Sequence, residues 1–318
     1  MSSIDIIIPS YNYARYLRDC VGSVQAQDVD YRILIVDNAS TDDSVAVAHE
    51  LAAADPRITV VARSVNLGLH ASLNEGVDWA VSPYQTLLCA DDILAPGSLA
   101  MAIAVLDADP RLVMALGEEQ PFWGSELPKL TVADRSPAEW EIVPGRTFID
   151  RHARLPAQHW NAAGVVVRTS AQRAIGHWRK EVEYGPDREI GLRLATVGDV
   201  AITKTVLSYV RYHHGNYSAP LRDLPTLLGH VDIAWRSFLA NEGARVEQSK
   251  ELAASYARNL AATAYWWGVR ALATARPGTA SKLFQFAYRT RPASVVVPPL
   301  HYILREDGPV RNLFRQRA

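Results

Sequence analysis

The segment LLCADDILAPG, residues 87–97, places two adjacent carboxylates directly after a short apolar run. Four residues suited to a buried strand lead into Asp91 and Asp92. Neighbouring anions repel each other, so the pair needs an explanation. A turn at this point would account for one aspartate but not for both. A hard divalent cation takes several oxygen ligands and reverses this electrostatic cost. The pair therefore predicts a divalent metal site at the end of a strand, and Cys89 beside it is expected to be a small buried apolar residue.

A second carboxylate, Asp37, follows another strand-like run in ILIVDNASTDDS. Ser40 and Asp43 resemble a capping box that would begin the next helix. Because Ser40 and Asp43 would already begin this helix, Asp37 is available to bind a ligand. A role in the turn and a role in binding both stay open on this pattern alone.

Two further segments carry candidate residues with structural alternatives. In YGPDREIGLRLA, Asp187 stands in the first turn of a helix after Pro186, where it would complement the helix dipole. In YVRYHHGNYS, His213 and His214 end a strand, so at most one of these neighbours should point into a shared site.

The segment NLGLHASLNEG lacks the glycine spacing of a dinucleotide-binding turn, which argues against a Rossmann dehydrogenase. In this segment Asn66 can cap a helix, and Gly76 can allow close packing.

The elements that must position these residues alternate along the first 110 residues. Strand-like runs occur at residues 4–8, 31–36, 58–62 and 85–90, and helical spacing at 14–26, 42–54 and 68–80. This order predicts a parallel sheet with helices on both faces. Ligands of such sheets bind beyond the carboxyl ends of the strands, where the candidate aspartates fall.

The rest of the chain has two parts. Further strands are expected at residues 112–117, 164–168, 199–203 and 206–211, with a helix starting near Pro186. After Pro220 the pattern is helical to about residue 290, which predicts domains at residues 1–219 and 220–318.

The C-terminal region leaves two questions open. The run at residues 266–292 mixes apolar residues with Arg and Lys, which suits either packing onto the N-terminal domain or a lipid interface. The aromatic cluster Tyr265, Trp266 and Trp267 suits helix packing, with an interface in a homodimer as the alternative.

Composition excludes several classes of protein. The 318 residues are 48% hydrophobic, which argues against general disorder. A formal charge of -1 argues against a dedicated nucleic-acid binder. Two cysteines without metal-ligand spacing fit a reducing cytoplasm. No signal peptide and no run of roughly 18 apolar residues is evident, so we expect a cytoplasmic protein with at most peripheral contact at the inner membrane face.

Six segments, taken in order, carry a family resemblance. They are IIIPSYNYARYLRDCVGSVQAQ, ILIVDNASTDDS, NLGLHASLNEG, LLCADDILAPGSL, YGPDREIGLRLA and VRYHHGNYS. Over residues 3–218 the chain resembles the family 2 glycosyltransferases with the GT-A fold. This implies an α/β, Rossmann-like, mostly parallel sheet flanked by helices, and the last hundred residues remain as a C-terminal helical extension.

The resemblance also implies an activity and roles for individual residues. The reaction would be an inverting transfer from a nucleotide diphosphate sugar to a carbohydrate or glycoconjugate hydroxyl, with Mg²⁺ or Mn²⁺. Nucleotide contacts are expected from Pro9, Tyr11, Asn12, Asp37, Asn66 and Asp91. Metal ligation is expected from Asp92 and His213, and general-base catalysis from Asp187.

The chain departs from the family pattern at two positions. Cys89 stands where many relatives have a further Asp, so the ion would rely on Asp92, water and diphosphate oxygens. Pro186 stands where Glu often precedes the base.

Two other functions are alternatives to glycosyl transfer. A sugar-nucleotidyltransferase would carry a Gly-rich, basic phosphate loop after its first strand, and PSYNYARYL contains no Gly. A non-catalytic nucleotide-sugar-binding protein would not need the four aspartates at 37, 91, 92 and 187.

Substrate identity is only partly constrained by the sequence. UDP is the favoured donor nucleotide because Asp37 suits the N3–H of uracil, although guanine also offers N–H donors. Residues 118–163 are expected to line the acceptor site, including Trp123, His159, Trp160 and Asn161.

Overall fold

The computed structural model describes residues 2–130, 139–158 and 163–304 of the chain. These residues form two compact units. The first takes the described residues within 1–148, 160–183 and 190–216, and the second takes those within 149–159, 184–189 and 217–318. The domain boundary near residue 220 stays a prediction, and the grouping of 149–159 and 184–189 with the C-terminal residues was not foreseen.

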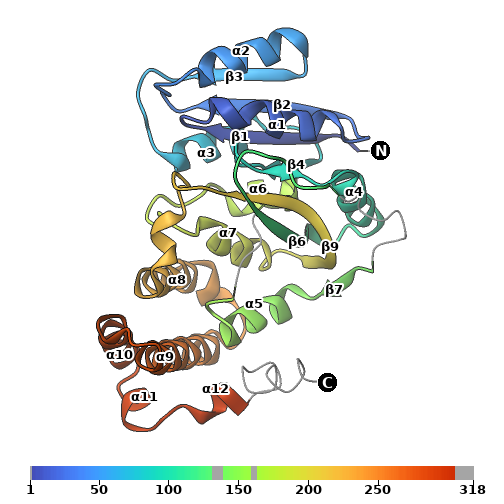
Figure 1. The fold of residues 1–318 in the computed structure, drawn as a ribbon. Coiled ribbons are helices and arrows are strands. Elements are labelled where there is room, and N and C mark those ends of the chain that lie inside the picture. The colour runs from blue at the N-terminus through green and yellow to red at the C-terminus, as the bar shows by residue number, and fades with distance from the viewer. Residues whose placement is uncertain (1, 131–138, 159–162, 305–318) are drawn as a thin grey trace. The chain divides into compact units, whose positions relative to one another are not determined.

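The first half of the sheet is parallel (Figure 1). Its strands are β1 (Ile4–Ser10), β2 (Tyr31–Asp37), β3 (Ile58–Ala62) and β4 (Tyr84–Leu87), in the order β3-β2-β1-β4. Four helices follow strands of the first unit: α1 (Ala14–Gln25), α2 (Ser44–Ala54), α3 (Leu69–Trp79) and α4 (Ser98–Ala108). The predicted alternation of strands and helices is confirmed.

The second half of the sheet is mixed. It contains β8 (Val166–Arg168), β6 (Leu112–Trp123), β9 (Asp199–Tyr212), β5 (Ile93–Leu94) and β7 (Glu141–Val143). Strand β8 is antiparallel to both β4 and β6, whereas β6 and β9 are parallel. The prediction of separate strands at 199–203 and 206–211 is wrong. The pairing of β6 with β9 shifts register between Leu116 and Glu118 and again between Glu118 and Glu119. Such a β-bulge interrupts the pairing only locally, so β9 continues as one strand.

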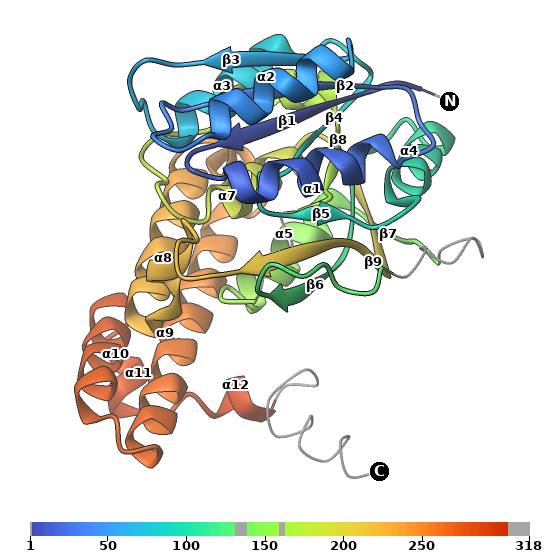
Figure 2. The same ribbon diagram turned by 45° about the horizontal axis from the view of Figure 1, so that its top comes forward.

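The two faces of the parallel strands are covered by different helices. Alternate residues of β1, such as Ile6, pack in one cluster with Leu17 of α1 and Ile103 of α4. Figure 2 shows α1 alongside β1. On the opposite face, a Cβ atom added to Gly76 of α3 would lie 2.4 Å from the side chain of Ile7. Only glycine allows α3 to approach β1 this closely, so Gly76 serves close packing.

The second unit is helical. Its main helices are α8 (Leu224–Ala240), α9 (Ser249–Ala273) and α10 (Pro277–Thr290), with shorter segments η1 (Ala219–Arg222), η2 (Glu242–Arg245), α11 (Ala293–Val296) and α12 (Leu300–Leu304). The predicted helical C-terminal region is confirmed. The remaining helices are α5 (Gly145–Arg154), α6 (Thr169–Ile175) and α7 (Pro186–Leu194).

Aromatic contacts hold the helices of the second unit together. The buried Trp235 stacks on Tyr256, with ring centroids 4.6 Å apart. Tyr265 meets Phe284 at 5.5 Å, and Trp266 donates a hydrogen bond to the carbonyl of Pro299. Helix packing therefore accounts for these two members of the aromatic cluster.

Among the described residues, no helix combines the length and the apolar character of a membrane span. For residues 266–292, packing onto the N-terminal domain stays the prediction, and a lipid interface stays its alternative.

Candidate functional site

The loops after β1, β2 and β3 are tied together at the carboxyl end of the sheet. Asn12 adopts a left-handed backbone, with φ of 60°, and its amide oxygen accepts a hydrogen bond from the Thr41 backbone N at 2.7 Å. Its own backbone N donates to Oγ of Ser40 at 2.9 Å. One loop further, Nδ2 of Asn38 donates to Oδ1 of Asn66 at 2.8 Å. The fold thus brings the predicted residues Asn12 and Asn66 to one edge.

Asp37 ends β2 and is fully buried. One carboxylate oxygen accepts from the Ser40 backbone N at 2.9 Å, and the other from the Ser40 hydroxyl at 2.5 Å. The predicted capping box is therefore wrong. Ser40 stabilises the turn through Asp37, and α2 begins at Ser44, which bonds Asp42 instead. The turn role of Asp37 is established, and its contact with a nucleotide base stays a prediction.

The other residues expected to contact the nucleotide differ in exposure. Pro9 is buried inside β1, opposite Val36 of β2. The Tyr11 side chain is 45% exposed. Of these two residues, only Tyr11 presents a side chain that a ligand can reach.

Three side chains at the end of β4 could hold a metal ion. The ligand atoms of Cys89, Asp91 and Asp92 all lie within 4.8 Å of one another. Burial raises the pKa of Asp92 well above its ordinary value, and the nearby Asp91 raises it further. A cation would relieve both effects, because it compensates the buried charge and attracts both carboxylates. The donor set therefore fits a divalent ion.

Cys89 is exposed, so its prediction as a buried residue is wrong. Strand β4 ends at Leu87, before the apolar run does. Cys89 therefore lies in the loop that carries the two aspartates.

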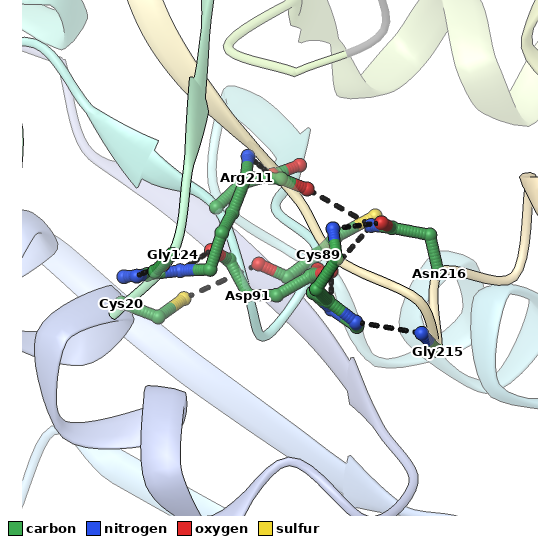
Figure 3. A network of polar contacts seen from close by, with 9 residues as sticks. Cys20, Cys89, Asp91, Gly124, Arg211, Gly215 and Asn216 are labelled. Atoms are coloured by element: carbon green, nitrogen blue, oxygen red, sulfur yellow. Dashed lines mark hydrogen bonds and ion pairs between the residues drawn. The ribbon is translucent and has the colours of Figure 1, made fainter. Parts of the chain in front are cut away.

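His213 and Asn216 both contact the first carboxylate of the pair. Nε2 of His213 lies 3.0 Å from Oδ2 of Asp91. Nδ2 of Asn216 donates to the same oxygen at 3.1 Å, and Figure 3 shows Asn216 beside Asp91. His214 is exposed, as expected if only one histidine of the pair faces the site. In the structure His213 orients Asp91, and its ligation of a metal stays a prediction.

Arg211 is the main site residue that the sequence reasoning missed. It is fully buried, and its Nε donates to the backbone carbonyl of Asp91 at 3.1 Å (Figure 3). Its backbone N donates to Oδ1 of Asp92 at 3.0 Å. The guanidinium lies over the rings of Tyr16 and Phe122, 4.4 Å and 4.6 Å from their centroids. The signal was the Arg of the R-x-H pattern, of which only the histidine was assigned a role.

Tyr13 was also missed. Its ring lies 5.7 Å from that of His213. Burial, with the negative charge of Asp91, raises the pKa of Tyr13 well above its ordinary value. The phenol therefore stays protonated beside the carboxylates. The available signal was the spacing of Tyr13 and Tyr16 in YNYARY, because residues three apart are neighbours on a helix surface.

Asp187 lies in the first turn of α7 and belongs to the second unit. The next residue, Arg188, is buried, and burial lowers its pKa to about 10. The base role of Asp187 stays a prediction.

The acceptor-site prediction falls partly on described residues. Trp123 is 70% exposed and stacks on Tyr212, with ring centroids 5.2 Å apart. His159, Trp160 and Asn161 lie outside the described residues.

Sequence comparisons identify relatives of the N-terminal part of the chain. Residues 5–145 match the model of glycosyl transferase family 2. The chain is 36% identical over 113 residues to polyprenol monophosphomannose synthase of Mycolicibacterium smegmatis, which covers 34% of this chain and 43% of that protein. The chain spans less than half the length of the curated relatives it matches.

Solved structures share the fold at low sequence identity. S. aureus TarS 1-349 in complex with UDP-GlcNAc has a TM-score of 0.57 at 14% identity and covers 92% of both chains. The mannosyltransferase PcManGT of Pyrobaculum calidifontis, in complex with GDP-Man and Mn²⁺, has a TM-score of 0.55 at 16% identity and covers 92% of this chain and 86% of that one. The predicted GT-A fold is confirmed. The sheet and the paired aspartates at the end of β4 thus lie in or beside a region, residues 5–145, that is similar to glycosyl transferase family 2.

Proposed function

We propose that the chain transfers a sugar from a nucleotide diphosphate sugar to an acceptor hydroxyl, with inversion at the anomeric carbon. The observation that carries this proposal is the grouping of Asp91 and Asp92 with Cys89 at the carboxyl end of the sheet, inside the segment that matches the family. A carbohydrate or glycoconjugate is the proposed acceptor.

Asp92 would hold the divalent ion, Mg²⁺ or Mn²⁺, and Asp91 would face the ribose. When bound, the ion stabilises the negative charge that develops on the leaving diphosphate. The protein's own contribution is to orient both carboxylates. Arg211 fixes Asp92 through its backbone N, and His213 with Asn216 fixes Asp91.

Asp187 is proposed as the general base. The acceptor hydroxyl gives its proton to the Asp187 carboxylate while its oxygen forms the new bond to the anomeric carbon. The bond from that carbon to the diphosphate oxygen breaks, and the electron pair leaves with the nucleoside diphosphate. No covalent enzyme intermediate is needed for inversion.

UDP is the proposed donor nucleotide. The support is the acceptor character of Asp37, which suits the N3–H of uracil. TarS is described with UDP-GlcNAc and PcManGT with GDP-Man, so likeness of fold is compatible with either base.

A thermal-shift screen of UDP, GDP and the corresponding sugar nucleotides, with and without Mn²⁺, tests the proposal. Ligands that bind only the native state raise the melting temperature. We expect the largest shift with UDP and Mn²⁺ together, and release of UDP from a UDP-sugar in the presence of acceptors. No shift and no turnover with any of these nucleotides would contradict a glycosyltransferase function.

Asp92→Asn tests the metal site directly. The variant keeps the size of the side chain but removes the charge that attracts the cation, so we expect Mn²⁺ to lose its enhancement of UDP binding in calorimetry. Asp78→Asn is the matched control because the Asp78 side chain is 69% exposed in the same unit. The same UDP affinity with EDTA as with Mn²⁺ in the wild-type protein would show that the metal role is wrong.

A further inference from the structure

We infer that Cys89 is itself a ligand of the divalent ion, so that the site is a mixed thiolate and carboxylate site that prefers softer ions to Mg²⁺. The inference builds on the proposed metal site but concerns metal choice, which can be measured without sugar transfer.

The arrangement of the three side chains supports shared ligation. Sγ of Cys89 and the carboxylate oxygens of Asp91 and Asp92 lie within 4.8 Å of one another. In a tetrahedral site with ligand bonds of roughly 2.0 to 2.3 Å, two ligands of one ion lie about 3.3 to 3.8 Å apart. The three side chains are therefore near ligand spacing, and rotation of the exposed Cys89 side chain is the movement that would bring its Sγ to the ion.

The chemistry of the donor set decides which ions are favoured. Oxygen ligands suit Mg²⁺, whereas a thiolate favours Zn²⁺, Cd²⁺ and Co²⁺. With an aspartate at position 89 the site would offer oxygen alone. The cysteine replaces one hard donor by a soft one, so Mg²⁺ should lose affinity relative to these ions.

The chain contains two cysteines, which makes the test specific. Cys20 is buried in the core, and its Sγ donates to the backbone carbonyl of Cys89 at 3.5 Å (Figure 3). Its thiol is the matched control for that of Cys89. Cys20→Ser keeps the size and a donor for this carbonyl.

The first measurement titrates Cd²⁺ alone into the full chain and follows sulfur-to-metal charge-transfer absorption. We expect the band in the wild-type protein and in Cys20→Ser, and its loss in Cys89→Ser. Asp92→Asn should weaken Cd²⁺ binding by at least about tenfold if the carboxylate shares the ion. No band at millimolar Cd²⁺, a band that survives in Cys89→Ser, or full Cd²⁺ affinity in Asp92→Asn would each overturn the inference.

The second measurement follows alkylation of Cys89 by iodoacetamide in Cys20→Ser. A bound thiolate is not available to the reagent, so saturating Zn²⁺ should slow modification by at least about tenfold, whereas Mg²⁺ should slow it less. Equal rates with and without Zn²⁺ would overturn the inference.

Cys89→Asp tests the selectivity itself. It should raise Mg²⁺ affinity relative to Cd²⁺ by at least about tenfold, measured by competition against Cd²⁺ in calorimetry. An unchanged ratio would overturn the preference for soft ions. Absence of sugar transfer in a protein that shows the charge-transfer band would contradict the proposed function and leave the metal inference standing.

Discussion

Asp187→Asn is expected to lower turnover by roughly two to four orders of magnitude, with little change in donor binding or melting temperature. Asn keeps the size and hydrogen-bonding reach of Asp but cannot accept the acceptor's proton. If Asp187 only complements the dipole of α7, the change should instead cost about 0.3 to 1 kcal/mol of stability and preserve activity. Turnover with saturating donor, measured beside thermal unfolding, separates the two roles.

Asp223 provides a matched control for the structural role. It caps α8 in the same unit, where its carboxylate accepts from the Thr226 backbone N at 3.2 Å and from the Thr226 hydroxyl at 2.7 Å. Asp223→Ala should cost about 0.5 to 2 kcal/mol of stability while turnover is preserved. If Asp187→Asn retained more than about a tenth of wild-type turnover, Asp187 would not be the base. Glu183 and Glu189 would then be tested next.

The parallel half of the sheet could be predicted because its signals are local and agree with one another. The run ITVVA forms β3 over the predicted residues 58–62, and the helix expected at 14–26 is α1 at Ala14–Gln25. Since parallel strands direct their carboxyl ends to one edge, the region of the site followed from the strand order.

The details of the site depend on contacts between distant parts of the chain, which no local pattern reveals. Ser40 matched a capping box, but it bonds Asp37 because the turn after β2 brings them together. Cys89 continued an apolar run, yet β4 ends before it. The side chain of Asp91 contacts that of His213, which lies 122 residues later in the sequence. The segment that carries His213 is positioned by the pairing of β9 with β5 and β6.

Arg211→Met is expected to destabilise the first unit by about 3 to 5 kcal/mol, because it breaks a buried charged network rather than a surface contact. The Arg211 side chain is completely buried, and its NH1 donates to the Gly124 carbonyl at 2.7 Å. Its NH2 lies 3.5 Å from Oδ2 of Asp19. Met preserves the apolar stem between Tyr16 and Phe122 but leaves these acceptors without their donor. Denaturant unfolding followed by circular dichroism measures the loss.

Arg18→Met is the matched control in the same unit. Arg18 pairs with Glu50 at the surface, with 56% and 62% of the two side chains exposed, so its removal should cost at most about 1 kcal/mol. Arg211→Lys should fall between the two, because Lys retains the charge but not the planar fork of donors. Arg211→Lys also remains measurable if Arg211→Met does not fold.

Because the Arg211 side chain holds the Asp91 backbone beside the paired carboxylates, Arg211→Lys should also weaken Mn²⁺ binding. Wild-type stability and Mn²⁺ affinity in Arg211→Lys would contradict this account of how the fold holds the paired carboxylates.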